Sequence, residues 1–358
     1  MTFHLYLLRQ LALAFVLSAG GMVFIALPGI AVGAVHKLGS VGMMAVLRYL
    51  PLVVAGFVPY VVPVALLLSL VSTYGRLAAQ NEWTAIRMAG MNPYRLLVPA
   101  FVLATLVGAG IYGTNAELLP RVKVLQKTIR ITEIRNGLRN LSPGRTNIEV
   151  EGFLLQASYR DPVQEHTFYD CFVSLPSKDQ VTPRSFFAET AKFAFLEEDM
   201  NVSLYNARGT EDAVQGAVER LVMTVPYEKF GEDLASHDFG SARYKSTPAL
   251  LDALQSGELS ERESRAFLYS FHQRMANAAT CLVFVLIGAS TGVLMRKGTQ
   301  LAALAVAVGY AISYWVLSLR LGKQLAESGA VEPWVGGWAP LGLFSLWGLW
   351  LMHRSLRE

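Results

Sequence analysis

Charged residues are sparse in this 358-residue chain, and two groups of them have types and spacing that could do chemistry. Glu82 and Arg87 lie in the first group, within residues 76–95, where a carboxylate near the start of a short helix suits docking onto a partner. The second group is a basic run, because residues 121–145 hold seven Lys/Arg against one acidic residue. Such a run next to apolar sequence suits contact with anionic headgroups.

Motifs for catalysis or nucleotide binding are absent from the sequence. There is no GxxxxGK[ST], GxSxG or HExxH pattern. The six histidines do not cluster, and Cys171 and Cys281 fall in different regions, so neither a metal site nor a disulfide framework is predicted. We therefore expect no cofactor and no enzymatic activity. If the protein does work, the energy should come from a partner.

The segment around Glu82 predicts a short helix over about residues 81–90. Asn81 is a possible N-cap, Gly90 can end the helix, and Pro93 prevents its continuation. This helix should present an apolar set together with Glu82 and Arg87; the apolar residues are Trp83, Ile86 and Met91. Two interpretations stay open at this point, namely a helix resting on lipid headgroups and a coupling helix that docks into a cytoplasmic partner.

The elements that must position these groups are membrane helices. Hydrophobic residues make up 53% of the chain and charged residues 16%, against about 25% charged in soluble domains. Six uncharged stretches are long enough to span a bilayer: Leu11–Val35, Tyr49–Gly75, Leu96–Ala116, Met275–Met295, Gly298–Leu319 and Pro333–His353. None contains Asp, Glu, Lys or Arg, which disfavours a proton-coupled carrier.

The charge distribution predicts the orientation of the chain. Residues 117–274 carry a net charge of −4 and the other residues +8, so the basic pI belongs to the apolar arms and indicates lipid headgroups rather than nucleic acid. With a cytoplasmic N-terminus, the inner segments hold eight Lys/Arg and the short outer loops four. The positive-inside rule then places both termini in the cytoplasm.

The polar middle of the chain reads mainly as short strands separated by breaks such as Pro143-Gly144, which favours a sandwich or an open barrel. We therefore divide the chain into three parts. Residues 1–119 hold three transmembrane helices and the helix at about 81–90, residues 120–270 hold an exported β domain with helical linkers, and residues 271–358 hold three more transmembrane helices.

Two segments resemble a known family. NEWTAIRMAGMNPYRLLVP (residues 81–99) is similar to the signature of the lipopolysaccharide-export permeases, the LptF/LptG family, with Glu82, Ala89 and Gly90 at matching places. SFHQRMANAATCLVFVLIGASTGVLMRKG (residues 270–298) resembles the family's C-terminal half, including the Arg before span four. The three-plus-three layout around an exported β domain matches as well.

The resemblance implies a fold and a function. The fold is an α-helical integral membrane protein with six transmembrane helices and an inserted all-β, jellyroll-like periplasmic domain. The chain would be a permease subunit in the inner membrane of a Gram-negative-type bacterium. It would pair with a paralogous permease and a cytoplasmic ABC ATPase dimer, extract lipopolysaccharide, and pass it to a periplasmic bridge protein. The ATPase-coupling residues would be Glu82, Arg87, Ala89 and Gly90.

An anionic glycolipid substrate would need basic residues at the outer membrane face. The resemblance and the charge pattern together favour His36, Lys37, Lys127 and Arg130 as substrate-binding residues. The alternative is that these side chains reach headgroups, as Lys and Arg at span ends commonly do.

Other interpretations follow from the same sequence. The chain could be another mechanical ABC membrane subunit, although those typically place the large outside domain after the first span. It could also be a membrane-anchored periplasmic enzyme, which no catalytic spacing supports. Gly288 and Gly292 form a GxxxG pair that could serve a partner interface or packing within the chain.

Overall fold

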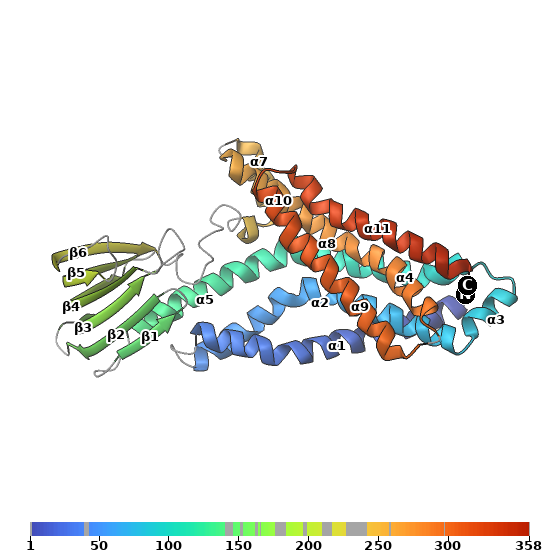
Figure 1. The fold of residues 1–358 in the computed structure, drawn as a ribbon, viewed down its shortest axis with the longest axis horizontal. Helices are drawn as coiled ribbons and strands as arrows, with labels where there is room; N and C mark the ends of the chain where they lie inside the picture. The colour runs from blue at the N-terminus through green and yellow to red at the C-terminus, as the bar shows by residue number, and fades with distance from the viewer. Residues whose placement is uncertain are drawn as a thin grey trace. The chain divides into compact units, whose positions relative to one another are not determined.

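A computed structural model describes most of the chain in two compact units. The described residues are 2–38, 43–139, 146–150, 153–161, 164, 166–175, 184–195, 199–209, 217–226, 242–257, 259–296 and 298–357. Unit 1 comprises Met1–Leu27, Val54–Lys123 and Asp238–Glu358, and unit 2 comprises Pro28–Val53 and Val124–His237. Helices α1, α2 and α5, which are labelled in Figure 1, each contribute residues to both units.

Six helical stretches are long and apolar enough to cross a membrane, which confirms the six predicted spans. Two of them continue through a π-helical turn, η1 and η6, into a further helix. The elements are α1 Thr2–Leu38, α2 Met43–Ala79, α4 Pro93–Gly113 with η1 Thr114–Leu118 and α5 Leu119–Arg139, α8 Glu261–Leu294, α9 Gln300–Trp315 with η6 Val316–Gly322 and α10 Lys323–Glu327, and α11 Pro333–Arg357.

Local sequence explains where several of these helices begin. Ser260 and Glu263 form a capping box at the start of α8: the Glu263 backbone N–H donates to Ser260 Oγ at 3.3 Å, and the Ser260 backbone N–H donates to Glu263 Oε2 at 3.0 Å. Thr299 caps α9 by accepting from the backbone N–H of Ala302. Polar caps therefore set the ends of helices whose interiors are apolar.

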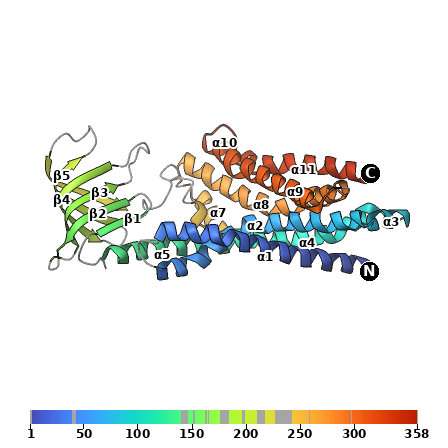
Figure 2. The ribbon, with the colours of Figure 1, turned by 60° about the horizontal axis from the view of Figure 1, so that its bottom comes forward.

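Helix α8 lies at the centre of unit 1. It packs against α4 and α11, and its buried residues Cys281, Val285 and Ala289 share an apolar cluster with Leu66 and Leu70 of α2. The ends of the chain lie beside the short helix α3 (Glu82–Met88), as Figures 1 and 2 both show. The two termini and the α3 connection thus share one end of the helices of unit 1.

Unit 2 contains the β domain and the adjoining ends of three helices. Gln126 Nε2 of α5 donates to the carbonyl of Leu52 in α2 at 2.6 Å, and Ala34, Val46 and Tyr49 form a small apolar cluster there. The described strands make one antiparallel sheet in the order β1-β2-β3-β4-β5-β6. They are β1 Thr146–Val150, β2 Phe153–Arg160, β3 Thr167–Leu175, β4 Arg184–Phe195, β5 Asp199–Gly209 and β6 Ala217–Pro226.

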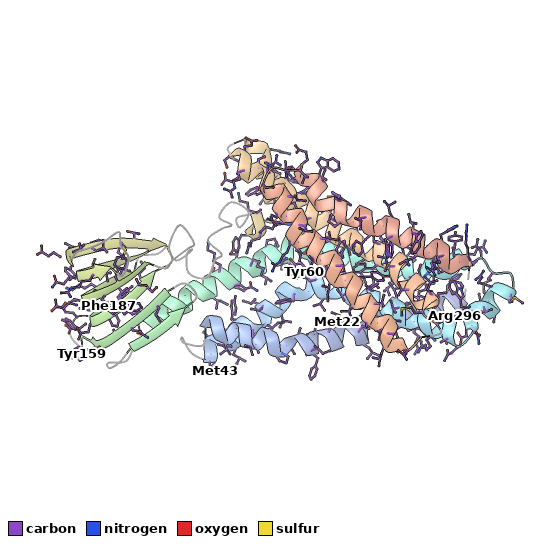
Figure 3. All side chains as sticks on the ribbon, viewed as in Figure 1. Met22, Met43, Tyr60, Tyr159, Phe187 and Arg296 are labelled. Atoms are coloured by element: carbon purple, nitrogen blue, oxygen red, sulfur yellow. The ribbon has the colours of Figure 1, made fainter. Side chains whose placement is uncertain are left out.

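The sheet confirms an inserted all-β domain. Buried residues such as Leu155, Phe168 and Val202 form its core, whereas Tyr159 and Phe187 are exposed and project from the sheet (Figure 3). Each described strand pairs with the next in sequence, which is a meander; a jellyroll has two sheets joined by long crossovers, and the six described strands contain no such crossover.

Candidate functional site

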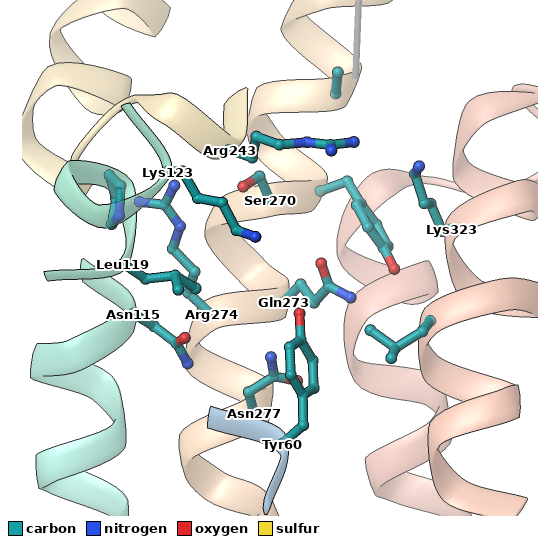
Figure 4. Close-up of a pocket in the computed structure, with 14 residues that line it drawn as sticks. Tyr60, Asn115, Leu119, Lys123, Arg243, Ser270, Gln273, Arg274, Asn277 and Lys323 are labelled. Carbon is teal, nitrogen blue, oxygen red and sulfur yellow. The ribbon is translucent and has the colours of Figure 1, made fainter. Parts of the chain in front are cut away.

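A polar cavity of about 330 Å³ lies among the helices of unit 1 (Figure 4). Its walls come from α2, from η1 and the start of α5, from the first half of α8, and from η6 and α10, with one residue from the 3₁₀ turn η5 (Ala242–Tyr244). The lining residues are Tyr60, Asn115, Leu119, Pro120, Lys123, Arg243, Ala266, Tyr269, Ser270, Gln273, Arg274, Asn277, Leu319 and Lys323.

The lining of this cavity is cationic. Lys123, Arg243, Arg274 and Lys323 contribute four basic groups, and the described lining residues include no Asp or Glu. In Figure 4 Lys123, Gln273 and Tyr60 turn toward the same space, with Arg243 and Lys323 along its upper edge. Charges of one sign in a partly enclosed space raise the local concentration of the opposite sign. The cavity is therefore suited to an anionic group.

Arg274 is the most buried of these cations, with 8% of its surface exposed. Its Nη1 donates to Thr247 Oγ1 at 3.0 Å, and its Nη2 donates to the carbonyls of Ala242 and Lys245 at 2.9 and 2.8 Å. All three acceptors are neutral. The hydrogen bonds satisfy the guanidinium, but they do not balance its charge.

Two asparagines place polar atoms at the cavity. Asn115 Nδ2 and Asn277 Oδ1 are buried, and neither has a hydrogen-bond partner among the described residues. Buried polar atoms normally find a partner. Both residues line the cavity, but these two atoms are enclosed by surrounding protein, so each is an unsatisfied polar group beside the cavity.

The two π-helical turns border this cavity. Asn115 lies in η1 and Leu319 in η6, and both turns lead directly into helices that bear lining cations. Tyr269 Oη donates to the carbonyl of Ser318 in η6 at 3.0 Å. Such turns occur frequently at functional sites, since the wider turn shifts the register of the helix.

Helix α3 (Glu82–Met88) lies within the range expected for it, about 81–90, but its details differ. Asn81 has a left-handed backbone (φ 60°) and its side chain makes no capping hydrogen bond, so the expected Asn81 cap is wrong. Gly90 ends the segment at φ 81°, a conformation that strongly favours glycine. Glu82 is exposed in the first turn.

The expectation that α3 presents Trp83 on its outer surface is also wrong. Trp83 is 3% exposed, and its ring lies 6.2 Å from that of Tyr74 in α2. Ile86 packs partly against the same cluster, whereas Met88 is 85% exposed. The apolar face of α3 is therefore attached to its own chain, and Glu82 lies on the free side.

Arg87 and Ala89 take different positions. Arg87 Nη2 donates to the carbonyl of Leu356, in the last turn of α11, at 3.0 Å. Ala89 is the exposed residue that follows α3. Arg87 thus connects α3 to the C-terminal helix.

The basic residues predicted for the substrate are not those of the cavity. Lys127 is half-buried in α5, within unit 2. His36 and Lys37 lie in the last turn of α1 and Arg130 lies in α5, but their side chains fall outside the described part of the structure. Of the cavity cations, only Lys123 belongs to the basic run. Arg243, Arg274 and Lys323 come from three further segments. Arg274 and Lys323 lie beside predicted spans, which is a sequence signal, whereas Arg243 has none.

The GxxxG pair packs within the chain. A Cβ on Gly292 would lie 2.8 Å from both Gly75 N and Val71 O, and one on Gly288 would lie 2.9 Å from Leu70 Cβ. These distances are shorter than real Cβ contacts, so only glycine permits this approach of α8 to α2. Of the two interpretations left open, packing within the chain accounts for both glycines.

Comparison with known proteins identifies the architecture. A family model described as lipopolysaccharide export system permease LptF/LptG matches residues 5–354, nearly the whole chain. No curated protein matches the chain.

Proposed function

This chain belongs to the LptF/LptG family of lipopolysaccharide-export permeases, and from that premise we propose how it acts on its substrate. It is a multi-pass inner-membrane permease subunit of the export system. We propose that it pairs with a paralogous permease and a cytoplasmic ABC ATPase dimer, and that ATP hydrolysis by this dimer drives lipopolysaccharide out of the membrane to a periplasmic bridge protein. The absence of a P-loop motif from the sequence supports a separate ATPase.

The cationic cavity is the proposed site for the anionic headgroup. The observation that carries this proposal is the lining of four basic groups without a carboxylate among the described lining residues. Its volume of about 330 Å³ is at the lower end of ligand pockets. That size suits a phosphorylated sugar, with the acyl chains remaining outside.

The position of the cavity along the chain supports the same assignment. Its residues lie where span three leads into the inserted segment, where span four returns from it, and at the end of span five. With both termini in the cytoplasm, as we propose, all three ends face the periplasm. A cavity at that level would meet lipopolysaccharide in the outer leaflet.

Binding measurements test this site. Arg243→Gln and Lys323→Gln should each weaken lipopolysaccharide binding to the purified complex about tenfold, the effect of losing one charge-assisted hydrogen bond. Arg296→Gln is the matched control, since Arg296 follows the opposite end of α8 (Figure 3). Unchanged affinity in both cavity variants would remove the cavity from the substrate path.

Glu82 is the proposed contact of α3 with the ATPase, with Arg87, Ala89 and Gly90 shaping that surface. Glu82 is exposed, and Trp83 of the same helix contacts Tyr74 of α2. A movement of α3 would therefore be transmitted to α2 through this contact. Glu82→Ala should reduce co-purification of the ATPase, whereas Thr84→Ala, at an exposed position of the same helix, should not. ATPase recovery at the wild-type level with Glu82→Ala would contradict the assignment.

His36, Lys37, Lys127 and Arg130 are proposed as further substrate contacts outside the cavity. The paired charge reversal Lys127→Glu with Arg130→Glu should lower crosslinking of lipopolysaccharide to the complex, because two repulsive charges replace two attractive ones. If crosslinking equals that of the unsubstituted protein, these residues contact membrane headgroups rather than the substrate.

A further inference from the structure

The turn that carries Arg243 is the first described segment after the inserted domain, and apolar packing holds one side of it. Ala242 is 1% exposed and belongs to a cluster with Leu250 and Phe267. Lys245 Nζ lies 5.0 Å from the centre of the Phe267 ring, a cation–π distance. These contacts fix the backbone on both sides of Arg243 without touching its guanidinium.

Arg274 holds the same turn from α8. Its three hydrogen bonds go to Ala242, Lys245 and Thr247, so its two carbonyl acceptors bracket Arg243 in the sequence. The planar guanidinium reaches three acceptors at once because its nitrogens point in fixed, different directions. A lysine offers a single nitrogen on a shorter chain and cannot span the same set.

We propose that Arg274 is a positioning residue that acts through Arg243. By fixing the backbone on both sides of Arg243, it holds that guanidinium at the cavity edge, where it meets the phosphate of the lipid. This inference rests on the proposed anion site. It adds that Arg274 affects phosphate recognition more than affinity for the lipid as a whole.

A discrimination ratio separates positioning from a merely structural role. We define it as the dissociation constant of the purified complex for phosphatase-treated lipid A, divided by that for the same lipid A with two phosphates. Damage to the fold weakens both ligands alike and leaves this ratio unchanged. Misplacement of Arg243 weakens only the phosphorylated ligand and lowers the ratio.

Four variants form the experiment. Arg243→Gln should lower the ratio about tenfold, and Arg274→Lys, which keeps the positive charge, about fivefold. The double variant should be no lower than Arg243→Gln alone, because Arg274 acts through the residue already lost. Thr247→Val removes one hydrogen-bond acceptor of Arg274 and keeps both arginines, so it should lower the ratio about twofold. This variant also tests the positioning role if Arg274→Lys does not fold.

Each outcome has one meaning. Two results would overturn the positioning role and leave the cavity assignment intact. The first is a double variant in which the two effects on the ratio multiply. The second is a ratio that falls in Arg243→Gln but stays unchanged in both Arg274→Lys and Thr247→Val. An unchanged ratio in Arg243→Gln and in Lys323→Gln would instead overturn the proposed anion site. The Arg296→Gln control should retain the wild-type ratio.

Discussion

In its first half helix α8 lines a polar cavity with Gln273, Arg274 and Asn277, whereas in its second half it packs against α2 through Gly288 and Gly292. The first half borders a space that it lines together with cations from other segments, and it carries the unpartnered amide oxygen of Asn277. The second half brings two backbones so close that a single Cβ would overlap them. One continuous helix thus carries both the proposed binding site and a close glycine contact with α2.

The contrast has a physical cause. Apolar side chains gain little from association inside lipid, so membrane helices hold together where small residues allow close van der Waals contact. Polar groups need partners at membrane depth, and they gather where helix ends leave room for them. We infer that substitutions at the glycine end change stability, and that substitutions at the cavity end change binding with smaller effects on folding.

The largest effect on stability is expected for Gly292→Leu. Its Cβ would meet Gly75 N and Val71 O at 2.8 Å, both backbone atoms that cannot move aside. We expect a loss of about 3 kcal/mol or a failure to fold, measured by thermal unfolding of the detergent-purified chain. Gly309→Leu is the control, because a Cβ at Gly309 meets nothing within 4 Å. Equal losses in the two variants would contradict the packing account.

At the cavity end, Asn277→Asp should change function while the fold persists. A carboxylate there would occupy the cationic space and repel an anionic ligand, so lipopolysaccharide affinity should fall about tenfold, or about 1.4 kcal/mol. Asn277→Leu, of similar size and without charge, separates repulsion from the loss of the amide. Wild-type binding by Asn277→Asp would indicate that the ligand lies elsewhere.

Between the two ends, Thr280 makes a polar contact in the packed interior. Its Oγ1 lies 2.6 Å from Tyr314 Oη, and both residues are fully buried. Thr280→Val should destabilise the chain by about 1 kcal/mol and leave lipid affinity unchanged. A fall in affinity without a loss of stability would extend the binding region further along α8 than proposed.

The smallest effect is expected at Gly75→Ala, on the other side of the Gly292 contact. A Cβ there would lie 3.5 Å from Gly292 O, an ordinary van der Waals distance. The change in unfolding free energy should stay within about 0.5 kcal/mol. A large loss would show that the close approach depends on both glycines rather than on Gly292.

The sequence predicted the membrane helices well and the local details of α3 less well. Hydropathy and flanking charges identified six spans, and Gly90 ends the α3 segment as expected. The Asn81 cap failed because that residue adopts a left-handed conformation. The prediction that Trp83 is exposed was wrong because this residue packs in an apolar cluster that includes Tyr74 of α2. The sequence pattern of α3 alone does not contain this contact with another helix.

The sequence predicted that the candidate site would be basic, but it did not predict most of the residues that form it. A basic region near the outer ends of the spans was predicted, yet Arg243, Arg274 and Lys323 were not selected. Arg274 and Lys323 lie next to apolar stretches, where such residues usually reach lipid headgroups, and Arg243 lies in a short polar segment well before span four. They became a site only when they met Lys123 across separate helices.

The sequence by itself determined the class of protein, the six spans and the family, because the bilayer imposes the same requirement on every residue of a spanning stretch and that requirement can be read locally. Only the tertiary structure decided which cations share a cavity, that Gly288 and Gly292 pack within the chain, and that Arg274 holds the turn of Arg243. Each of these depends on contacts between residues far apart in sequence. Their distances are set by helix packing, not by composition.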